Sequence, residues 1–374
     1  MQGTFTEKHL LGLCVIARDE AHNLPRLLHS AAPWVGEMVV VDTGSVDDTA
    51  AVATALGARV VHSPWQNSFA LARNASLDAA TAPWALVLDA DEELVVTDAK
   101  AFAHALQTVQ HAFALDCHDL RDDGSFSVAP LLRLFRNKSP LMRFEGAVHE
   151  QLVGVARGGV GVAHAAFMHF LHTGHTSQVL AQRHKDQRNL DLARAQVRQT
   201  ADDPFAWYCL GQALLTQPTR ERQEQAILAF GQAMGRLTAG HEGEAYVVSL
   251  FLSHAQTLLQ LQQTDEGVAI LNVALAGFPD SPDLRLARAR AYMTAGDYAQ
   301  AEIDLRACLD DNAAAFFVRL NPTATGYEAR LTLGLCLLRQ QRWSEAEGHL
   351  RAAAATAPAG DERANALLGT LNSR

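Results

Sequence analysis

The sequence predicts an α/β domain built on a mostly parallel sheet, followed by an all-α repeat domain. Over about the first 90 residues, short apolar runs alternate four times with helix-like segments, a pattern typical of parallel sheets with helices on both faces. Beyond residue 203 the pattern is helical and repeats itself. A chain of 374 residues is long enough for two domains of ordinary size.

The elements of the α/β domain follow from the apolar runs and the residues that end them. Pro25 suits the first turn of a helix, and Asp47, Asp48 and Thr49 can begin the next one. Strands are therefore expected at 11–17, 38–41, 59–62 and 84–91, and helices from about Asn23 to Leu28, at 50–56 and at 69–80.

From residue 113 the expected strands become shorter. They lie at 113–117, 126–128 and 131–135, with Asp123-Gly124 as a hairpin turn. A histidine-rich piece at 169–175 precedes a long amphipathic helix at 177–200. The apolar side of that helix carries Val179, Leu190, Ala193 and Val197.

Charged residues stand where three of the expected strands end. Arg18-Asp19-Glu20 follows the first strand, Asp42 the second, and Asp89 and Asp91 the fourth. Ligands of parallel α/β sheets bind outside the carboxyl ends of the strands. The sequence therefore predicts a binding site at this edge of the sheet.

Asp89 and Asp91 are the pair around which this site is predicted. Because side chains alternate along a strand, Asp89 and Asp91 are expected to share a face, with Ala90 on the opposite one. Neighbouring carboxylates repel unless a cation lies near them, and Mg²⁺ or Mn²⁺ is commonly held by one or two carboxylates together with substrate phosphates. The alternative is a solvated acidic turn after a buried strand.

The second half of the chain carries a repeat of about 34 residues, the spacing of tetratricopeptide repeats. Leu210-Gly211, Ala226, Phe230 and Ala233 align with Leu333-Gly334, Ala346, Leu350 and Ala353, and two more units fit between them. An insert at 316–326 separates the last two units, and residues 361–374 supply part of a capping helix. A generic helical bundle is the alternative interpretation.

Composition excludes several classes of function. The formal net charge of −10 gives no support for nucleic-acid binding. Five scattered cysteines without a C-x-x-C pair indicate reduced thiols and a cytoplasmic location. No transmembrane segment or export leader is expected, because the run 10–17 is too short to span a bilayer and no basic segment precedes it.

The first 200 or so positions resemble family 2 glycosyltransferases of the GT-A (Rossmann-like, nucleotide-sugar-binding) fold. The subgroup with trailing tetratricopeptide repeats is most similar, and it includes sublancin-type peptide S-glycosyltransferases and lipopolysaccharide-core glucosyltransferase relatives. The resemblance rests on Arg18-Asp19-Glu20-x-x-Asn23-Leu24, Val41-Asp42-Thr43-Gly44-Ser45-x-Asp47-x-Thr49, Phe69-Ala70-x-x-Arg73-Asn74, Asp89-Ala90-Asp91-Glu92, Arg133-Leu-Phe-Arg136-Asn137 and Phe144-x-Gly146-x-x-His149-Glu150. The expected domains are 1–176 for the glycosyltransferase, 177–202 for a linker helix and 203–374 for the repeats.

The resemblance also implies roles for individual residues. Glu20 and Asp42 would lie near the nucleoside, Arg73 near the pyrophosphate, and Asp89 near the ribose or metal. Asp91 would bind the metal with a late histidine, in the first instance His172. The sequence His172-Thr173-Gly174-His175 departs from the His-aromatic-Gly-aromatic pattern, so His169 and His175 remain alternatives. Arg18, Gly44 and Ala90 complete the implied donor-binding set. Taken singly, Asp42 could be a strand-ending turn residue, Arg73 a surface charge and His149 a core histidine.

Glu150 with His149 is the best-placed pair to take the acceptor's proton. The expected function is thus a metal-dependent, inverting glycosyltransferase that uses a nucleotide-sugar donor such as a UDP-hexose. Its acceptor would be a peptide, protein or glycan held by the repeats. Alternatively, the repeats only brace the catalytic domain or mediate self-association. The rival is a non-catalytic interaction protein with a degenerate front domain. Nucleotidyl transfer is disfavoured, because no Gly-rich phosphate loop with a following lysine lies near the first strand.

Overall fold

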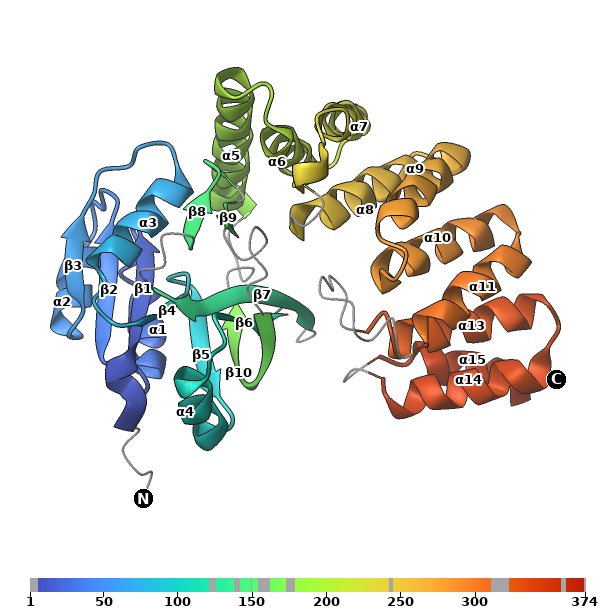
Figure 1. Ribbon diagram of the computed structural model, residues 1–374, viewed down its shortest axis with the longest axis horizontal. Coiled ribbons are helices and arrows are strands. Elements are labelled where there is room, and N and C mark those ends of the chain that lie inside the picture. Colours follow the sequence, from blue (N-terminus) through green and yellow to red (C-terminus); the bar gives the residue numbers. More distant parts are fainter. Residues whose placement is uncertain are drawn as a thin grey trace. The chain divides into compact units, whose positions relative to one another are not determined.

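The protein is described by a computed structural model that divides into two compact units, Met1–Thr200 and Ala201–Arg374. The structure describes residues 6–120, 126–137, 142–148, 150–153, 162–172, 179–241, 245–310, 323–357 and 361–372. Three predicted features lie outside these residues: the Asp123-Gly124 turn, most of the insert at 316–326, and the histidines at 149 and 175. Figure 1 shows the strands of the first unit in blue to green and the helices of the second in olive to red.

The first unit alternates strands and helices along its first 107 residues and then becomes mostly strand. Its elements are η1 (Thr6–Leu10), β1 (Leu11–Ala17), α1 (Leu24–Ala31), β2 (Glu37–Asp42), α2 (Thr49–Ala55), β3 (Arg59–His62), α3 (Phe69–Ala79), β4 (Trp84–Val87), β5 (Glu92–Val96), α4 (Ala99–Gln107), β6 (Ala112–Leu120), β7 (Phe126–Arg136), β8 (Arg143–Glu145), β9 (Gln151–Val153), β10 (Val162–His172) and α5 (Val179–Gln199).

Eight of the described strands form one sheet in the order β3-β2-β1-β4-β7-β6-β10-β5. The first four strands of that order run parallel, which confirms the prediction for the front of the chain. The other half is mixed. β7 is antiparallel to both β4 and β6, β10 is parallel to β6, and β5 is antiparallel to β10. β8 and β9 pair separately.

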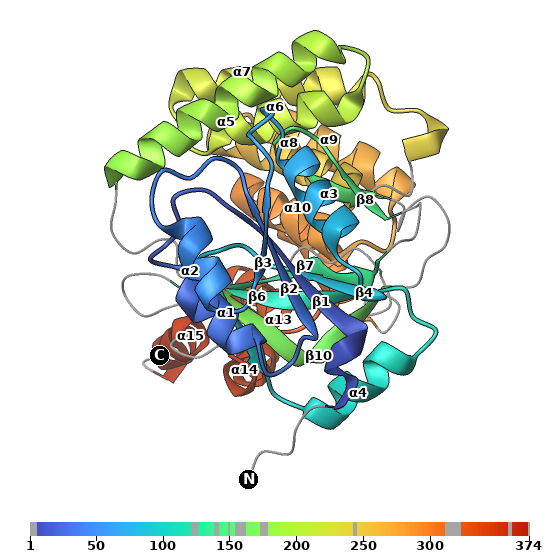
Figure 2. The same cartoon turned by 90° about the vertical axis from the view of Figure 1, so that its left-hand side faces the viewer.

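The two faces of the sheet have separate apolar cores, as side-chain alternation requires. On one face Leu13 and Val15 of β1 pack with Leu27 of α1 and Phe102 of α4. On the other face Cys14 packs with Leu77 of α3. Figure 2 shows α1 and α2 on one side of β1 and β2, and α3 on the other. The buried strands and the amphipathic helices thus form three layers, with the sheet between helices on its two faces.

Helix α5 belongs to the first unit. Leu190, Ala193 and Val197 are buried, which confirms three members of its predicted apolar side. The side-chain amide oxygen of Gln196 accepts a hydrogen bond of 3.0 Å from the backbone N–H of Ala147, in the loop after β8. This contact ties α5 to the segment that precedes Glu150.

The second unit consists of antiparallel helix pairs. Its described elements are α6 (Pro204–Leu215), α7 (Arg220–Met234), η2 (Ala239–His241), α8 (Ala245–Gln260), α9 (Thr264–Gly277), α10 (Pro282–Ala295), α11 (Tyr298–Cys308), α13 (Tyr327–Arg339), α14 (Trp343–Ala355) and α15 (Arg363–Asn372). α15 places Ala364 against Leu350 of α14, as a capping helix should.

The predicted alignment of the first and last repeats is confirmed by their packing. A methyl group added at Gly211 would lie 2.2 Å from the ring of Phe230, and one added at Gly334 would lie 2.6 Å from the side chain of Leu350. The sequence alignment had matched these same two pairs of positions. In both repeats the glycine lets the two helices approach, and the large residue of the second helix fills the space.

His254 of α8 should make the stability of the repeat unit depend on pH. Its side chain is buried beside Phe230 and Met234, and this burial lowers the pKa of His254 from 6.5 to about 4. The unfolded chain therefore takes up a proton near pH 6.5, whereas the folded chain does not. The free energy of unfolding is therefore highest, with respect to this group, above pH 6.5. It falls as the pH drops from 6.5 towards 4, by about 3 kcal/mol at most.

Urea unfolding of the full chain between pH 7.5 and 4.5 measures this effect. We expect His254→Gln to flatten the pH dependence of the transition assigned to the repeats, relative to the wild type. His241→Gln, at a less buried position in η2, is the matched control. An unchanged pH slope in the His254 variant would show that other groups cause the dependence.

Candidate active site

The site is built at the edge where β1, β2 and β4 end. Ala17 pairs in register with Asp42, and Cys14 pairs with Val87, so the three carboxyl ends lie side by side. The segments after them, 18–20, 43–48 and 88–91, therefore leave the sheet at one edge. This confirms the predicted position of the charged residues.

Asp42, at the end of β2, organises the loop that follows it. Its Oδ1 atom accepts hydrogen bonds from the backbone N–H groups of Gly44 (3.2 Å) and Ser45 (2.8 Å) and from the Ser45 hydroxyl (2.6 Å). The Nδ1 atom of His62 lies 3.1 Å from its Oδ2 atom. Burial alone would raise the pKa of Asp42, but the hydrogen bonds from Ser45 and its neighbours lower it, so the carboxylate is ionised at neutral pH.

Gly44 permits this loop because its φ angle of +109° lies in the region that favours glycine. The loop is also joined to the segment after β1. The backbone N–H of Asp19 donates to the Ser45 hydroxyl (3.0 Å), and the backbone N–H of Glu20 donates to the Thr49 hydroxyl (2.8 Å). Asp19 and Glu20 are therefore held against the Asp42 loop before any ligand binds, while the Arg18 side chain is about half exposed.

An ion network crosses the site behind these loops. Arg73 of α3 donates from Nε to Glu150 (2.5 Å) and from Nη2 to Asp89 (2.8 Å). Arg133 of β7 donates from Nη2 to Asp89 and to Glu92, each at 3.0 Å. The chain of contacts thus runs Glu150–Arg73–Asp89–Arg133–Glu92. It links three carboxylates through two arginines.

This network sets the charge states of its carboxyl groups. Burial would raise the pKa of Asp89, but Arg73 and Arg133 lower it far below its usual range. Burial and the nearby Asp89 charge raise the pKa of Glu92 to about 7, against the opposing effect of Arg133. Asp89 is therefore a fixed anion at the centre of the network.

The strand predicted at 84–91 ends earlier than expected. β4 stops at Val87, and residues 89–92 form a turn in which the backbone N–H of Glu92 donates to the carbonyl of Asp89 (3.0 Å). The prediction that Asp89 and Asp91 share a strand face is wrong for this reason. A carboxylate oxygen of Glu92 also accepts from the backbone N–H of Asp89 (2.7 Å), which closes the turn. Ala90 is buried within it.

Asp91 lies beside His172, the last residue of β10. Its Oδ2 atom is 3.4 Å from His172 Nε2, and each side chain is about one quarter exposed (24% and 25%). The antiparallel pairing of β10 with β5 sets His172 opposite Glu92, next in sequence to Asp91. Burial would raise the pKa of Asp91, but the contact with His172 lowers it.

The pair of Asp91 and His172 fits a divalent metal that is completed by substrate. A carboxylate oxygen and an imidazole nitrogen are both suitable ligands for Mn²⁺. Within the described ranges no group of three or more His, Cys, Asp or Glu side chains is arranged to hold a metal. The described part of the chain would thus supply two ligands, and the phosphates of a nucleotide could supply others.

His169, another candidate for the late histidine, stacks on His118 of β6 with ring centroids 4.3 Å apart. Burial and the neighbouring His118 lower the pKa of His169, partly offset by Asp116. Of the two candidates among the described residues, His172 is the one that lies beside Asp91. His175 and the proposed partner of the base, His149, lie outside the described residues.

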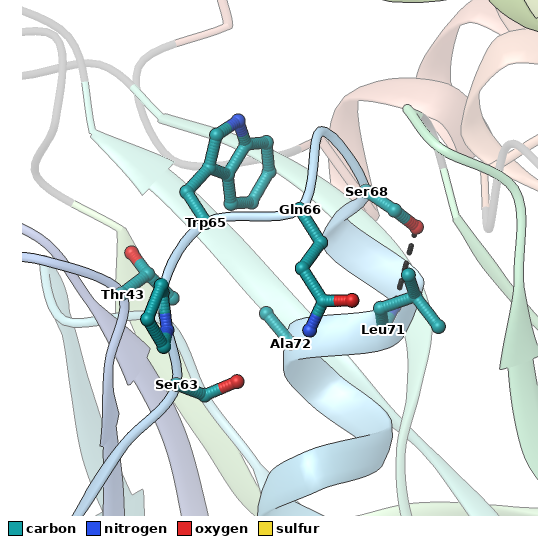
Figure 3. Close-up of a pocket in the computed structure, with 8 residues that line it drawn as sticks. Thr43, Ser63, Trp65, Gln66, Ser68, Leu71 and Ala72 are labelled. Atoms are coloured by element: carbon teal, nitrogen blue, oxygen red, sulfur yellow. Dashed lines mark hydrogen bonds between the residues drawn. The ribbon is translucent and has the colours of Figure 1, made fainter.

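A shallow recess adjoins the Asp42 loop, between the end of β3 and the start of α3. Figure 3 shows Trp65 and Gln66 at its rim and the hydroxyl of Ser68 bonded to the backbone of Leu71; Thr43, Ser63, Pro64 and Ala72 complete the lining. The backbone N–H of Trp65 donates to the carbonyl of Thr43 (3.1 Å), so the recess is fixed to the Asp42 loop.

Residues 13–160 match the model of the Glycosyl transferase family 2. This segment is a family 2 glycosyltransferase domain. Residues 225–309 and 312–361 match tetratricopeptide-repeat models, so the helical unit is a tetratricopeptide-repeat region. The predicted fold class, an α/β GT-A-like domain followed by a helical repeat, is confirmed.

Relatives share these parts over limited lengths. A TPR repeat-containing protein of Synechococcus elongatus is 43% identical over 143 residues, which cover 37% of this chain and 34% of the relative. Glycosyltransferase SunS of Bacillus subtilis is 23% identical over 224 residues, covering 57% of this chain and 50% of SunS. The chain thus spans between a third and half of these relatives. A tetratricopeptide repeat protein structure from Parabacteroides merdae is 16% identical with a TM-score of 0.40, covering 52% of this chain and 68% of that one.

The glycosyltransferase domain contains site residues to which the sequence assigned no role. Arg133 and Glu92 stand in two of the motifs on which the family resemblance rests, and this membership was the sequence signal that could have identified them as site residues. Arg26 of α1 donates from Nη2 to the backbone carbonyl of Asp91 (2.9 Å), a contact that no sequence motif predicted.

None of the helices in the described ranges has the length and apolarity that a membrane crossing requires.

Proposed function

We propose that the glycosyltransferase domain transfers a hexosyl group from a nucleotide-sugar donor, a UDP-hexose in the first instance, to an acceptor nucleophile with inversion at the anomeric carbon. The observation that carries the proposal is the meeting of three features at one edge of the sheet. These are the ionised Asp42 loop, the Asp91–His172 pair and the carboxylate of Glu150 held by Arg73.

Each feature has a role in a single displacement. Asp42 and the Glu20 segment hold the nucleoside, and Asp91 with His172 would hold a divalent metal. When bound, that metal would neutralise charge on the departing nucleoside diphosphate, so no protonated side chain is needed at the leaving group. Glu150 accepts the proton of the acceptor as the acceptor atom forms its bond to the anomeric carbon and the bond to the diphosphate breaks.

The acceptor proposed here is a peptide, protein or glycan held by the tetratricopeptide repeats. Stacked repeats form extended concave surfaces that commonly bind extended ligands. The competing proposal is a degenerate domain that serves interaction alone. The ionised Asp42, the Asp91–His172 pair and the preformed Arg73–Glu150 contact favour catalysis, because a domain that had lost its chemistry would have no need of them.

Thermal stability of the full chain with nucleotide sugars tests the proposal. We expect a UDP-sugar to raise the unfolding temperature in the presence of Mn²⁺ and to raise it much less in chelator, because ligands that bind the folded state stabilise it. GDP- and CMP-sugars compare bases, and uridine controls for the phosphates. Donor hydrolysis is then measured with the sugar that binds. If no nucleotide sugar binds or is hydrolysed, the interaction protein becomes the better account.

A further inference from the structure

We infer that Arg73 is a positioning residue that orients Glu150 for proton transfer, rather than a residue that binds the donor pyrophosphate. This inference rests on the proposed function, since it concerns the base of that reaction. It differs from the role that the family resemblance implied for Arg73, and it gives that residue a testable effect on turnover.

The placement of Arg73 is fixed from its own helix. Its side chain is only 8% exposed, and it lies on the buried face of α3 with Ala70 and Leu77. The guanidinium lies 5.5 Å from the centroid of the Phe144 ring. Phe144 is bonded through its backbone to the side chain of Asn74, the next residue of the helix. Helix α3 and strand β8 therefore hold Arg73 from two sides.

The guanidinium binds two carboxylates through different nitrogens. Nε–H points to Glu150, whose side chain is 11% exposed, and Nη2–H points to Asp89, which is 32% exposed. A planar guanidinium presents its N–H groups at fixed angles, so the bond to Asp89 also fixes the direction of the bond to Glu150. A lysine ammonium would keep the charge but not this geometry.

The anchor of Arg73 is itself held. Asp89 accepts from Arg133 through its other oxygen, and Arg133 also binds Glu92. The carboxylate of Glu150 is thus connected through Arg73 to Asp89, in the turn that also carries Asp91, and from Asp89 through Arg133 to Glu92. The base lies in a loop after β8, and on such a segment its position depends on contacts with rigid elements.

The remaining guanidinium nitrogen also bears on the inference. Nη1 is buried and has no hydrogen-bond partner among the described residues. A guanidinium committed to binding an exposed diphosphate would direct its N–H groups towards solvent. Instead, the two bonded nitrogens of Arg73 are directed at protein carboxylates, and the third is enclosed.

Steady-state kinetics of the full chain, with the donor identified by the binding screen, test the inference. We expect Arg73→Gln to lower kcat by about 10- to 100-fold, since a base displaced by about 1 Å can lose that much rate. The donor KM and the affinity for nucleoside diphosphate should change less than about twofold. Arg73→Lys should recover part of the lost kcat. If the glutamine variant does not fold, the same measurements are made on the lysine variant. Arg143→Gln is the matched control, because Arg143 bridges to Asp78 of the same helix (2.8 Å) and should leave kcat unchanged.

A double-mutant cycle separates positioning from a general structural effect. If Arg73 acts through Glu150, Arg73→Gln should cost little more in a Glu150→Gln background. Arg143→Gln, whose partner Asp78 lies outside this network, should have as little effect in the Glu150→Gln background as in the wild type. A tenfold rise in donor KM at constant kcat, or a fully additive double mutant, would overturn the inference. Failure of the proposed function is seen separately, in a wild-type protein that transfers no sugar.

Discussion

Glu150→Gln is expected to lower kcat for sugar transfer by about 100-fold or more while the affinity for donor changes little. A general base contributes roughly 10²- to 10⁴-fold, and the glutamine amide cannot accept the acceptor's proton. Its side-chain oxygen can still accept the hydrogen bond from Arg73, so the surrounding network should persist. Initial rates at saturating donor, together with nucleotide titrations, measure the two quantities.

Two comparisons make this result specific to the base. Slow donor hydrolysis should survive in the Glu150 variant, because water can attack without a fixed base. Glu145→Gln, at an exposed position on β8, should transfer at the wild-type rate. Should Glu150→Gln transfer sugar as fast as the wild type, Glu150 is not the base, and His149 and Asp119 become the candidates to replace next.

Local sequence signals were sufficient for the first 80 residues. The apolar run 11–17 became a strand with those bounds, since buried parallel strands are nearly continuous in apolar residues, and a strand begins at Arg59 as predicted. Turn and capping residues separated them from the helices, as Ser68 does at the start of α3 by accepting a bond from Leu71. The position of Asp42 and Asp91 at one edge of the sheet then followed from the topology of parallel sheets, although the turn that carries Asp91 did not.

The detailed geometry of the site depended on pairings between distant strands. β7 pairs with β4 so that Leu134 lies opposite Leu86, and this register brings Arg133 to the end of β4, beside Asp89. β10 pairs with β5 so that His172 lies opposite Glu92. A strand's apolar pattern specifies which face is buried, but not which partner strand it joins. For this reason the contact of Arg133 with Asp89 could not be found from spacing alone.

The shortened strand β4 shows a local competition that the sequence pattern concealed. Residues 84–91 have the pattern of one apolar strand that ends in acidic residues. In the structure, however, the Glu92 carboxylate accepts a hydrogen bond from the backbone N–H of Asp89 and stabilises a turn there. Acidic side chains that bond to nearby backbone N–H groups compete with strand pairing in this way. The turn directs Asp89 to the two arginines and Asp91 to His172. Asp89 and Asp91, two positions apart, therefore have different surroundings and, in our proposal, different roles.

Asp91→Asn should abolish the metal dependence of nucleotide binding while leaving the fold intact. The substitution removes the negative charge from one of two protein groups that would hold the metal, and hard divalent cations depend on carboxylate charge. Because Asp91 is partly exposed and is not part of the Arg73 and Arg133 network, its loss should cost little stability. We expect the wild type to bind nucleoside diphosphate at least tenfold more tightly in Mn²⁺ than in chelator, and the variant to bind equally weakly in both.

The matched control for this change is Glu93→Gln, two residues further along. Glu93 is a similarly exposed carboxylate whose partner is Arg26 of α1, at 3.9 Å, rather than His172. It should retain the response to Mn²⁺. His172→Ala should resemble Asp91→Asn if both side chains hold the same ion, because losing either ligand leaves one. Isothermal titrations of nucleoside diphosphate in Mn²⁺ and in chelator measure these affinities. If the wild-type protein binds with the same affinity in both, Asp91 and His172 do not hold a metal.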